Sequence, residues 1–356
     1  MIKNIKIGKN IIGENSKTYV ITEIGSNHNN DLEKAYKMID IAKRCGSNAV
    51  KFQIFREKRL YAPNAGKVDY LKLNKTINEI VIENEAPLSF HKKLHNYCKK
   101  KKITYLCTPT DEMLADYLDE IGVEAFKIAS YASTHLPLIR HIAKKGKPII
   151  LSTGSTSLFE IHEAVETILS QKNEKIIILH CVSKYPARLQ ECNLNIIKKL
   201  REQFNFPIGL SDHSLDPVVA PVTAVVLGAK VIEKHFTLNK RDYGPDQKFS
   251  IDPDQLRIMI NAIRGAEKSL GTDEKKIFSF EKELRDFAHR SIFSTKEIKK
   301  GEKFTKNNIA VLRPGKKKKG LMPKYYEIIL GAKSFKNIKA GKAINLKDFI
   351  LYGKKK

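Results

Sequence analysis

Eight short apolar segments, rich in β-branched residues, recur along the first two thirds of the chain with helical stretches between them. Their apolar runs are continuous rather than alternating, which is typical of strands buried on both faces of a parallel sheet. Eight strand–helix units over about 280 residues predict the α/β class and a (β/α)8 TIM barrel. A doubly wound sheet is the alternative, and it needs fewer units. The predicted strands are Tyr19–Ile24, Ala49–Phe55, Ile103–Cys107, Ala125–Ala129, Pro148–Ser152, Lys175–His180, Pro207–Ser211 and Lys230–Phe236.

The segment 32–43 illustrates the helical stretches. Its residues Leu32, Ala35, Ile39 and Ala42 share one apolar stripe at helical spacing. Asn30 or Asp31 is a suitable N-terminal cap, and Cys45-Gly46 is a suitable end. We therefore predict a helix directly after the first strand.

The C-terminal part contains an internal repeat with an offset of 40 residues. Ile298-Lys-Lys-Gly301 matches Ile338-Lys-Ala-Gly341, and the match continues from Phe304 to Ile344 and from Ile309 to Phe349. The repeat predicts a small β-clip-like domain with pseudo-twofold symmetry. A domain of this size is expected to dock on a larger one. The predicted organisation is a barrel at 1–280, a linker at 281–290 and the small domain at 291–356.

The charge of the chain is strongly basic, with a formal net charge of +26. Residues 291–356 hold 19 Lys or Arg and 4 Asp or Glu, so more than half of the excess lies there. Without a recognition motif, a Lys-rich solvated surface is the simpler interpretation, and no nucleic-acid partner is expected. No run of 18 apolar residues exists, and residues 1–8 lack the apolar core of a signal peptide. Five cysteines without a CxxC pair fit free thiols, so we expect a cytoplasmic protein without a membrane span.

Polar residues gather where the predicted strands end, and barrel active sites lie at those ends. Lys51 and Lys127 emerge from otherwise apolar strands, although Lys is almost never buried without a partner. With hydroxyl groups around them, they favour the binding of an anion with many oxygens, such as a phosphate or a carboxylate. A snorkelling surface Lys and a Schiff-base Lys are the alternatives. The hydroxyl-bearing residues are Thr108, Ser130, Ser152, Ser183 and Ser211.

Two histidines end the last two predicted strands. His213 follows Asp212, and His235 lies close to Glu233. Two imidazoles from neighbouring strands can hold one divalent metal ion and leave positions open for water and substrate. The alternative is a pair of packed core histidines. His28 and His180 are expected to be structural or to act behind the metal ligands.

These residues together resemble the sialic acid synthase family, the phosphoenolpyruvate-dependent synthases of nonulosonic acids. The C-terminal part, with Val311-Leu-Arg-Pro-Gly315, is similar to the family's antifreeze-like SAF domain. The resemblance covers essentially the whole chain. The motifs that carry it are Glu23-Ile-Gly-Ser-Asn-His28, Val50-Lys-Phe-Gln53, Phe126-Lys-Ile-Ala-Ser130, Leu151-Ser-Thr-Gly154, Gly209-Leu-Ser-Asp-His213, Ile232-Glu-Lys-His-Phe-Thr237 and Gly244-Pro-Asp246.

The resemblance implies a transferase that condenses phosphoenolpyruvate with an N-acylated hexosamine. It implies that His213 and His235 hold a divalent metal, usually Mn²⁺, with Mg²⁺ or Co²⁺ as options. It implies a domain-swapped homodimer in which Arg313 of one subunit reaches the partner's barrel. The implied phosphoenolpyruvate-binding residues are Lys51, Thr108, Lys127, Ser130, Ser152, Ser183 and Ser211. The implied sugar-facing residues are Glu23, Gln53, Tyr185, Asp246 and Arg313, and the catalytic set is Glu23, Lys51, Lys127, His213 and His235.

The sugar is less tightly specified by the motifs. Gly244-Pro-Asp246 resembles the branch that uses N-acetylmannosamine or its 2,4-diacetamido relatives, whereas Lys248-Phe-Ser250 is closer to the pseudaminic acid branch. Another phosphoenolpyruvate-dependent 3-deoxy-ulosonate synthase, which uses a sugar phosphate, is one alternative function. A non-catalytic carbohydrate- or polyanion-binding protein is the other.

Overall fold

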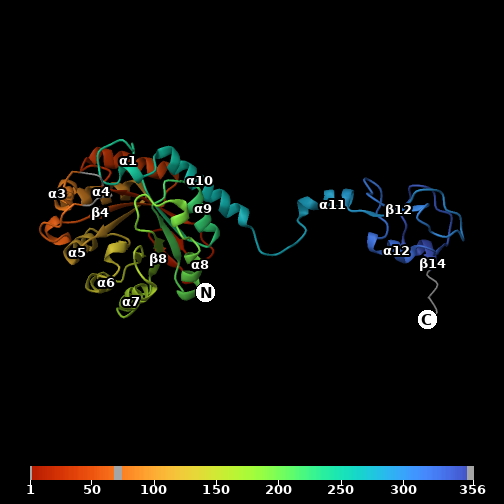
Figure 1. Cartoon of the computed structure of the whole chain (residues 1–356), viewed down its shortest axis with the longest axis horizontal. Helices are drawn as coiled ribbons and strands as arrows, with labels where there is room; N and C mark the ends of the chain where they lie inside the picture. Colours follow the sequence, from red (N-terminus) through yellow and green to blue (C-terminus); the bar gives the residue numbers. More distant parts are fainter. Residues whose placement is uncertain (1, 68–73, 351–356) are drawn as a thin grey trace. The chain divides into compact units, whose positions relative to one another are not determined.

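The computed structural model describes residues 2–67 and 74–350, and internal contacts divide the chain into units 1–271 and 272–356. In the first unit, strands surround a central axis and helices lie outside them (Figure 1). All eight predicted strands are confirmed, and no strand end differs by more than two residues from the one expected. The strands are β3 (Tyr19–Gly25), β4 (Ala49–Ile54), β5 (Thr104–Pro109), β6 (Phe126–Ile128), β7 (Ile149–Ser152), β8 (Ile176–Cys181), β9 (Ile208–Asp212) and β10 (Val231–His235).

The order of the strands identifies the barrel. Hydrogen bonds join parallel neighbours in the order β5-β4-β3-β10-β9-β8-β7-β6, and the two end strands, β5 and β6, contact each other. Around the ring this is the order of the chain itself. A doubly wound sheet would reverse its strand order, so the structure excludes that alternative and confirms the (β/α)8 prediction.

Helices follow each strand and cover the outside of the ring. The predicted helix after the first strand is present as α1, where the Asp31 side chain accepts a hydrogen bond from Lys34 N and Gly46 ends the helix with φ of 98°. Asp31, rather than Asn30, is therefore the cap. The helices of this unit are α1 (Leu32–Cys45), α2 (Glu57–Leu60), α3 (Ile77–Asn84), α4 (Leu88–Lys101), α5 (Glu112–Glu120), α6 (Leu136–Ala143), α7 (Leu158–Leu169), α8 (Ile196–Gln203), α9 (Val219–Val226) and α10 (Pro253–Leu270).

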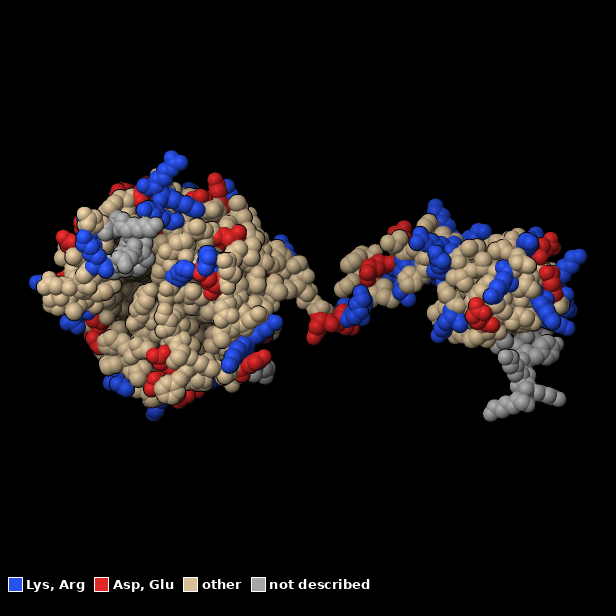
Figure 2. All heavy atoms as spheres, in the orientation of Figure 1, with Lys and Arg blue, Asp and Glu red and all other residues tan. Residues whose placement is uncertain are grey.

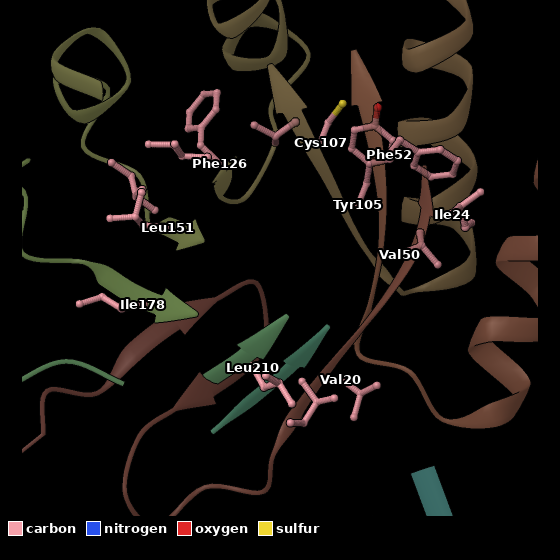
Figure 3. Packing of buried hydrophobic residues seen from close by; sticks show 14 of the residues in the cluster. Val20, Ile24, Val50, Phe52, Tyr105, Cys107, Phe126, Leu151, Ile178 and Leu210 are labelled. Carbon is pink, nitrogen blue, oxygen red and sulfur yellow. The ribbon is translucent and has the colours of Figure 1, made fainter. Parts of the chain in front are cut away.

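Two hydrophobic clusters lie on the two faces of the ring. The larger cluster joins strand residues such as Val20, Val50 and Leu151 to the helices (Figure 3). The smaller cluster contains the alternate strand residues together with Ile5, Ile7 and Ile12 of the N-terminal hairpin β1 (Ile5–Ile7) and β2 (Asn10–Ile12). Because side chains alternate along a strand, this second set fills the inside of the barrel, and the hairpin closes its N-terminal end. Among the described residues, no helix has the length and hydropathy needed to cross a membrane.

The second unit follows the predicted pseudo-twofold symmetry. Ile298 and Ile338 exchange backbone hydrogen bonds, and Gly301 N donates to Ser334 O as Gly341 N donates to Ser294 O. The repeated residues Phe304, Ile309, Ile344 and Phe349 share one hydrophobic cluster. The elements are α11 (Lys282–Ala288), β11 (Ser291–Ser294), β12 (Ile309–Leu312), α12 (Tyr326–Ile329), β13 (Lys333–Ser334) and β14 (Phe349–Ile350).

The unit boundary after Gly271 places the predicted linker 281–290, which contains α11, with the small domain. Residues 351–356, the end of the predicted domain, lie outside the described residues. Lys and Arg side chains are spread over the visible face of this unit (Figure 2), in keeping with a basic solvated surface.

Candidate functional site

Four charged side chains form one layer inside the barrel. Glu23, Lys51, Lys127 and Glu233 each lie two residues beyond a member of the interior cluster, namely Ile21, Ala49, Ala125 and Val231. The strand period of two therefore turns all four toward the barrel axis, near the C-terminal ends of β3, β4, β6 and β10. The strands that form the core also deliver the charges.

The two lysines converge on one carboxylate. Glu233 Oε1 lies 3.0 Å from Lys127 Nζ and 3.6 Å from Lys51 Nζ, and Lys51 Nζ also lies 2.8 Å from Glu23 Oε2. All four side chains are buried. Sequence reasoning noted Glu233 beside His235 but gave it no role at the lysines. Its position in phase with Val231 and His235 was the available signal.

The charges of this layer depend on one another. Burial acts to raise the pKa of Glu233, but Lys127 and Lys51 together lower it to about 2. For Glu23 burial dominates, and its pKa is raised despite the neighbouring Lys51. Burial lowers the pKa of Lys127, although Glu233 opposes the shift. Glu233 is thus the firmly ionised carboxylate, and Glu23 is the one closer to carrying a proton.

The predicted hydroxyl groups reach the same space. Ser211 Oγ donates to Glu233 Oε1 at 3.1 Å, and Thr108 Oγ1 accepts from Lys51 Nζ at 3.5 Å. Ser130 Oγ accepts from Gly154 N at 2.9 Å. Ser152 Oγ and Ser183 Oγ are buried, and neither has a hydrogen-bond partner among the described residues. A buried hydroxyl without a partner is costly, so these two donors are suited to a ligand oxygen.

Gly154 allows these hydroxyl groups to approach the backbone closely. A Cβ at this position would lie 2.4 Å from Ser183 Oγ and 3.0 Å from Ser130 Oγ. No side chain fits there without displacing one of them. The glycine of the Leu151-Ser-Thr-Gly154 motif therefore keeps a small concave cradle open beside the lysines.

The two predicted metal-binding histidines lie together. The centroids of the His213 and His235 rings are 5.5 Å apart. His213 Nδ1 donates to Val182 O at 2.8 Å, so the lone pair of the ring is on Nε2, which lies 4.0 Å from Cys181 Sγ. His235 Nδ1 is buried 3.6 Å from Asp246 Oδ2 and has no hydrogen-bond partner in the part of the chain that the structure describes. Burial lowers the pKa of both imidazoles, so each is neutral at pH 7 and has a lone pair to offer.

The described residues contain no group of three His, Cys, Asp or Glu side chains arranged to hold a metal ion. The protein ligands would therefore be the two imidazoles, with the remaining positions filled by water or substrate. An orphaned buried His235 Nδ1 beside a neutral His213 fits an ion bound in this way.

The predicted sugar-facing residues of the barrel flank the histidines. The Tyr185 ring packs 4.2 Å from that of His213, and Gln53 Nε2 donates to Glu23 Oε1 at 2.7 Å. Asp246 approaches Gly25, where a Cβ would lie 2.7 Å from its Oδ2. Burial, with a contribution from Glu23, raises the pKa of Asp246 to about 7.

Arg313 is the one predicted site residue outside the barrel unit. It directly follows β12 and its side chain is exposed. His28 and His180, predicted to be structural or to act behind the metal ligands, each bond to the backbone. His28 Nδ1 accepts from Asn30 N at 3.0 Å, and His180 Nε2 lies 2.8 Å from the carbonyl oxygen of Cys192.

A cavity of about 900 Å³ lies at the opposite end of the barrel, around the N-terminal hairpin. Its lining includes Glu14 and Arg201, which pair with each other at 2.7 Å, and none of the predicted site residues. Its size does not make it the site, because the buried lysines, the neutral imidazoles and the unpartnered Ser152 and Ser183 hydroxyl groups of the described residues belong to the other end.

Known proteins share this combination of a barrel and a small C-terminal domain. Residues 38–275 match the model of the NeuB family, and residues 289–350 match that of the SAF domain. An N,N'-diacetyllegionaminic acid synthase from Campylobacter jejuni is 39% identical over 92% of this chain and 99% of its own length. A pseudaminic acid synthase from the same organism is 37% identical over 94% of this chain and 97% of its own length.

A solved structure gives the same result. The N-acetylneuraminic acid (sialic acid) synthetase of Leptospira borgpetersenii, in complex with citrate, superposes with a TM-score of 0.73 at 34% identity. The alignment covers 81% of this chain and 96% of that one. The chain therefore belongs to the NeuB family of sialic acid synthases and ends in a SAF domain.

Proposed function

We propose that this protein is a transferase that condenses phosphoenolpyruvate with an N-acylated hexosamine. The products are a sialic-acid-type nonulosonic acid and inorganic phosphate. The names of the relatives support the class of product. The observation that carries the proposal is the pairing of two half-sites: buried lysines with unpartnered hydroxyls on one side, and two neutral imidazoles on the other.

The anionic cosubstrate would bind at the lysines. Phosphoenolpyruvate carries a phosphate and a carboxylate. Lys51 is a cation beside Thr108, and Lys127 is a cation that shares Glu233 Oε1 with Ser211. In a buried layer such cations bind anions much more strongly than they would in water. Their task would be to hold the enol phosphate in place and to stabilise the charge on the departing phosphate.

His213 and His235 would hold a divalent metal, most often Mn²⁺, with Mg²⁺ or Co²⁺ as alternatives. When bound there, such an ion supplies Lewis-acid polarisation of the aldehyde oxygen of the open-chain sugar. Tyr185, Gln53 and Asp246 lie close to these rings and to Glu23, so they would orient the sugar.

In the reaction, C3 of phosphoenolpyruvate would form a bond to the aldehyde carbon, and the aldehyde oxygen would take up a proton. Water would then add to C2 and lose a proton, and phosphate would leave with cleavage of its C–O bond. Glu23 is our candidate for handling a proton or binding a sugar hydroxyl, because burial raises its pKa and Lys51 and Gln53 fix its position.

The proposal extends to the assembly and the location of the protein. We propose a domain-swapped homodimer in the cytoplasm, in which Arg313 of one subunit serves the partner's barrel. An Arg313→Ala substitution should then raise the KM for the sugar and leave phosphoenolpyruvate binding largely unchanged. Loss of phosphoenolpyruvate binding in this variant would contradict the role.

The legionaminic and pseudaminic acid synthases are 39% and 37% identical to this chain, so both classes of acceptor sugar are represented among its relatives. We propose an N-acetylmannosamine or a 2,4-diacetamido-6-deoxyhexose as acceptor. Asp246, which lies beside His235 and Gly25, is the residue best placed to sense the difference.

The decisive experiment measures phosphate release from phosphoenolpyruvate with Mn²⁺ and a panel of free and phosphorylated hexosamines. We expect release only with a free N-acyl hexosamine. Release only with sugar phosphates would instead support a 3-deoxy-ulosonate synthase. The absence of release with every sugar, in a chain that still binds carbohydrate or polyanions, would support the non-catalytic alternative.

A further inference from the structure

A second buried ion pair lies directly behind the two histidines. Lys234 Nζ is 2.6 Å from Asp212 Oδ2, and both side chains are almost fully buried. The two residues face each other across the parallel strands β9 and β10. Since side chains alternate, Asp212 and Lys234 point away from the barrel axis, whereas the adjacent His213 and His235 point toward it.

The pair also fixes the turn that follows His213. Asp212 Oδ1 accepts from Ser214 N at 2.8 Å, and Lys234 Nζ donates to the carbonyl oxygens of Ser214 and Asp216. Asp216 Oδ1 in turn accepts from the backbone of Val218 at the start of α9. One ammonium group on β10 therefore ties together the strand end, the turn and the helix that come after β9.

The distance between the His213 and His235 rings depends on the ends of β9 and β10. His213 is oriented by Val182 O through its Nδ1. His235 Nδ1 has no hydrogen-bond partner among the described residues, and its ring is placed by the backbone of β10 and by packing against Phe249, with ring centroids 5.1 Å apart. The Lys234–Asp212 pair joins β10 to β9 one residue before both histidines.

We propose that Lys234 and Asp212 are positioning residues that set the spacing of the His213 and His235 rings and thereby the affinity of the site for a divalent metal. The proposal deepens the proposed function and rests on it for the metal. A buried pair of this kind adds little to stability compared with apolar residues of similar size. The role of the Lys234–Asp212 pair is to fix the register of the ends of β9 and β10.

The test is a double variant, Asp212→Asn with Lys234→Met. The asparagine oxygen can still accept from Ser214 N, and methionine fills the space of the lysine stem, so no unpaired buried charge is left. We expect the Kd for Mn²⁺, titrated by the EPR signal of the free ion, to rise by about 10-fold to 100-fold. The Kd for phosphoenolpyruvate, measured by calorimetry on metal-free protein, should stay within about twofold.

A matched control removes another partly buried pair of the same unit. Arg264→Met with Glu267→Gln breaks a 2.9 Å ion pair on α10, where Glu267 accepts from Thr18 N just before β3. Both double variants lose some thermal stability, but only the first should weaken Mn²⁺ binding. An equal loss of Mn²⁺ affinity in the control would overturn the proposal, as would an equal loss of Mn²⁺ and phosphoenolpyruvate affinity in the first variant.

A readout that needs no metal separates this proposal from the proposed function. NMR of protein labelled with ¹³C in its histidines should show shifted or broadened signals for His213 and His235 in the first double variant, with the other histidines unchanged. Unchanged signals for these two rings would refute the positioning role. If the wild-type protein binds no Mn²⁺, the metal part of the proposed function fails, and the histidine signals alone decide the positioning role.

Discussion

Glu233 Oε1 lies 3.0 Å from Lys127 Nζ, and both side chains are buried inside the barrel. The same oxygen is 3.6 Å from Lys51 Nζ, so one carboxylate neutralises part of the charge of two lysines. An anion that binds to these lysines must share them with Glu233. The carboxylate therefore limits how tightly the site can hold a phosphate, while it makes two buried ammonium groups tolerable in the folded chain.

A Glu233→Gln variant should lower the stability of the fold and strengthen anion binding at the two lysines. Removing one partner of a buried ion pair leaves an uncompensated charge, and we expect a loss of about 3 kcal/mol in the free energy of unfolding. Phosphoenolpyruvate should bind more tightly to the variant and raise its melting temperature more than that of the wild-type protein. Thermal unfolding with and without phosphoenolpyruvate measures both effects.

The control for this experiment is Glu163→Gln, on the exposed side of α7. It changes the net charge equally but touches nothing in the barrel, and surface substitutions cost within about 0.5 kcal/mol. If phosphoenolpyruvate stabilises the Glu233→Gln protein no more than the wild type, the two lysines are not the anion site.

Metal removal should abolish phosphate release, and added Mn²⁺ should restore it. A His213→Gln variant lacks a direct metal ligand. The Mn²⁺ concentration that restores its activity should therefore rise by more than the roughly 100-fold expected when a residue that only supports a ligand is lost. His180→Gln is the matched control. His180 is also buried, and the Cys192 carbonyl oxygen is its only hydrogen-bond partner among the described residues. Equal Mn²⁺ requirements in the two variants would contradict the metal role of His213.

The sequence was sufficient to predict the barrel, because continuous apolar runs such as Lys175–His180 and Pro207–Ser211 occur in strands covered on both faces. The sequence also predicted that Lys51 and Lys127 belong to the site at the ends of the strands. The period of two along β10 places Glu233 inside the barrel, but its pairing with Lys127 could not be found from the pattern, since β10 and β6 are far apart in the chain and only ring closure brings them together.

The clusters of polar residues at the ends of β9 and β10 also did not predict which of their side chains point into the barrel. Asp212 and Lys234 directly precede His213 and His235 in the sequence, and this adjacency does not show which of the four side chains enter the site. The alternation of the strand sends the first two outward, where they pair with each other. Applying the period of two from Val231 onward would have separated the two sets.

The stability of the barrel should fall in mild acid, in part through His91. Burial lowers the pKa of His91 to about 3, with smaller contributions from His28 and Arg56. The unfolded chain binds a proton near pH 6.5 and the folded one does not, so stability is full above pH 6.5 and is lost as the pH falls toward 3. His91 alone should cost about 2 kcal/mol at pH 5 relative to pH 7.

A His91→Gln variant tests this contribution, because its amide can still bond the Tyr105 hydroxyl, which lies 3.0 Å from His91 Nδ1. Urea unfolding of both proteins at pH 7 and pH 5 gives the difference. We expect the wild type to lose about 2 kcal/mol more than the variant over this range. Parallel losses in the two proteins would show that His91 is not the group that titrates.

The last prediction concerns the glycines of the C-terminal repeat. Gly301 and Gly341 have φ values of 85° and 74°, in the left-handed region that a side chain strains. A Cβ at Gly301 meets no atom within 4 Å, so Gly301→Ala isolates the backbone cost, about 1–2 kcal/mol.

Gly265, within α10, also has open space around it but no positive φ, and Gly265→Ala should instead stabilise by about 0.5–1 kcal/mol. Melting curves of the two variants should therefore shift in opposite directions. A stabilised Gly301→Ala protein would mean that the repeat does not require the left-handed turn at the point where its two halves exchange hydrogen bonds.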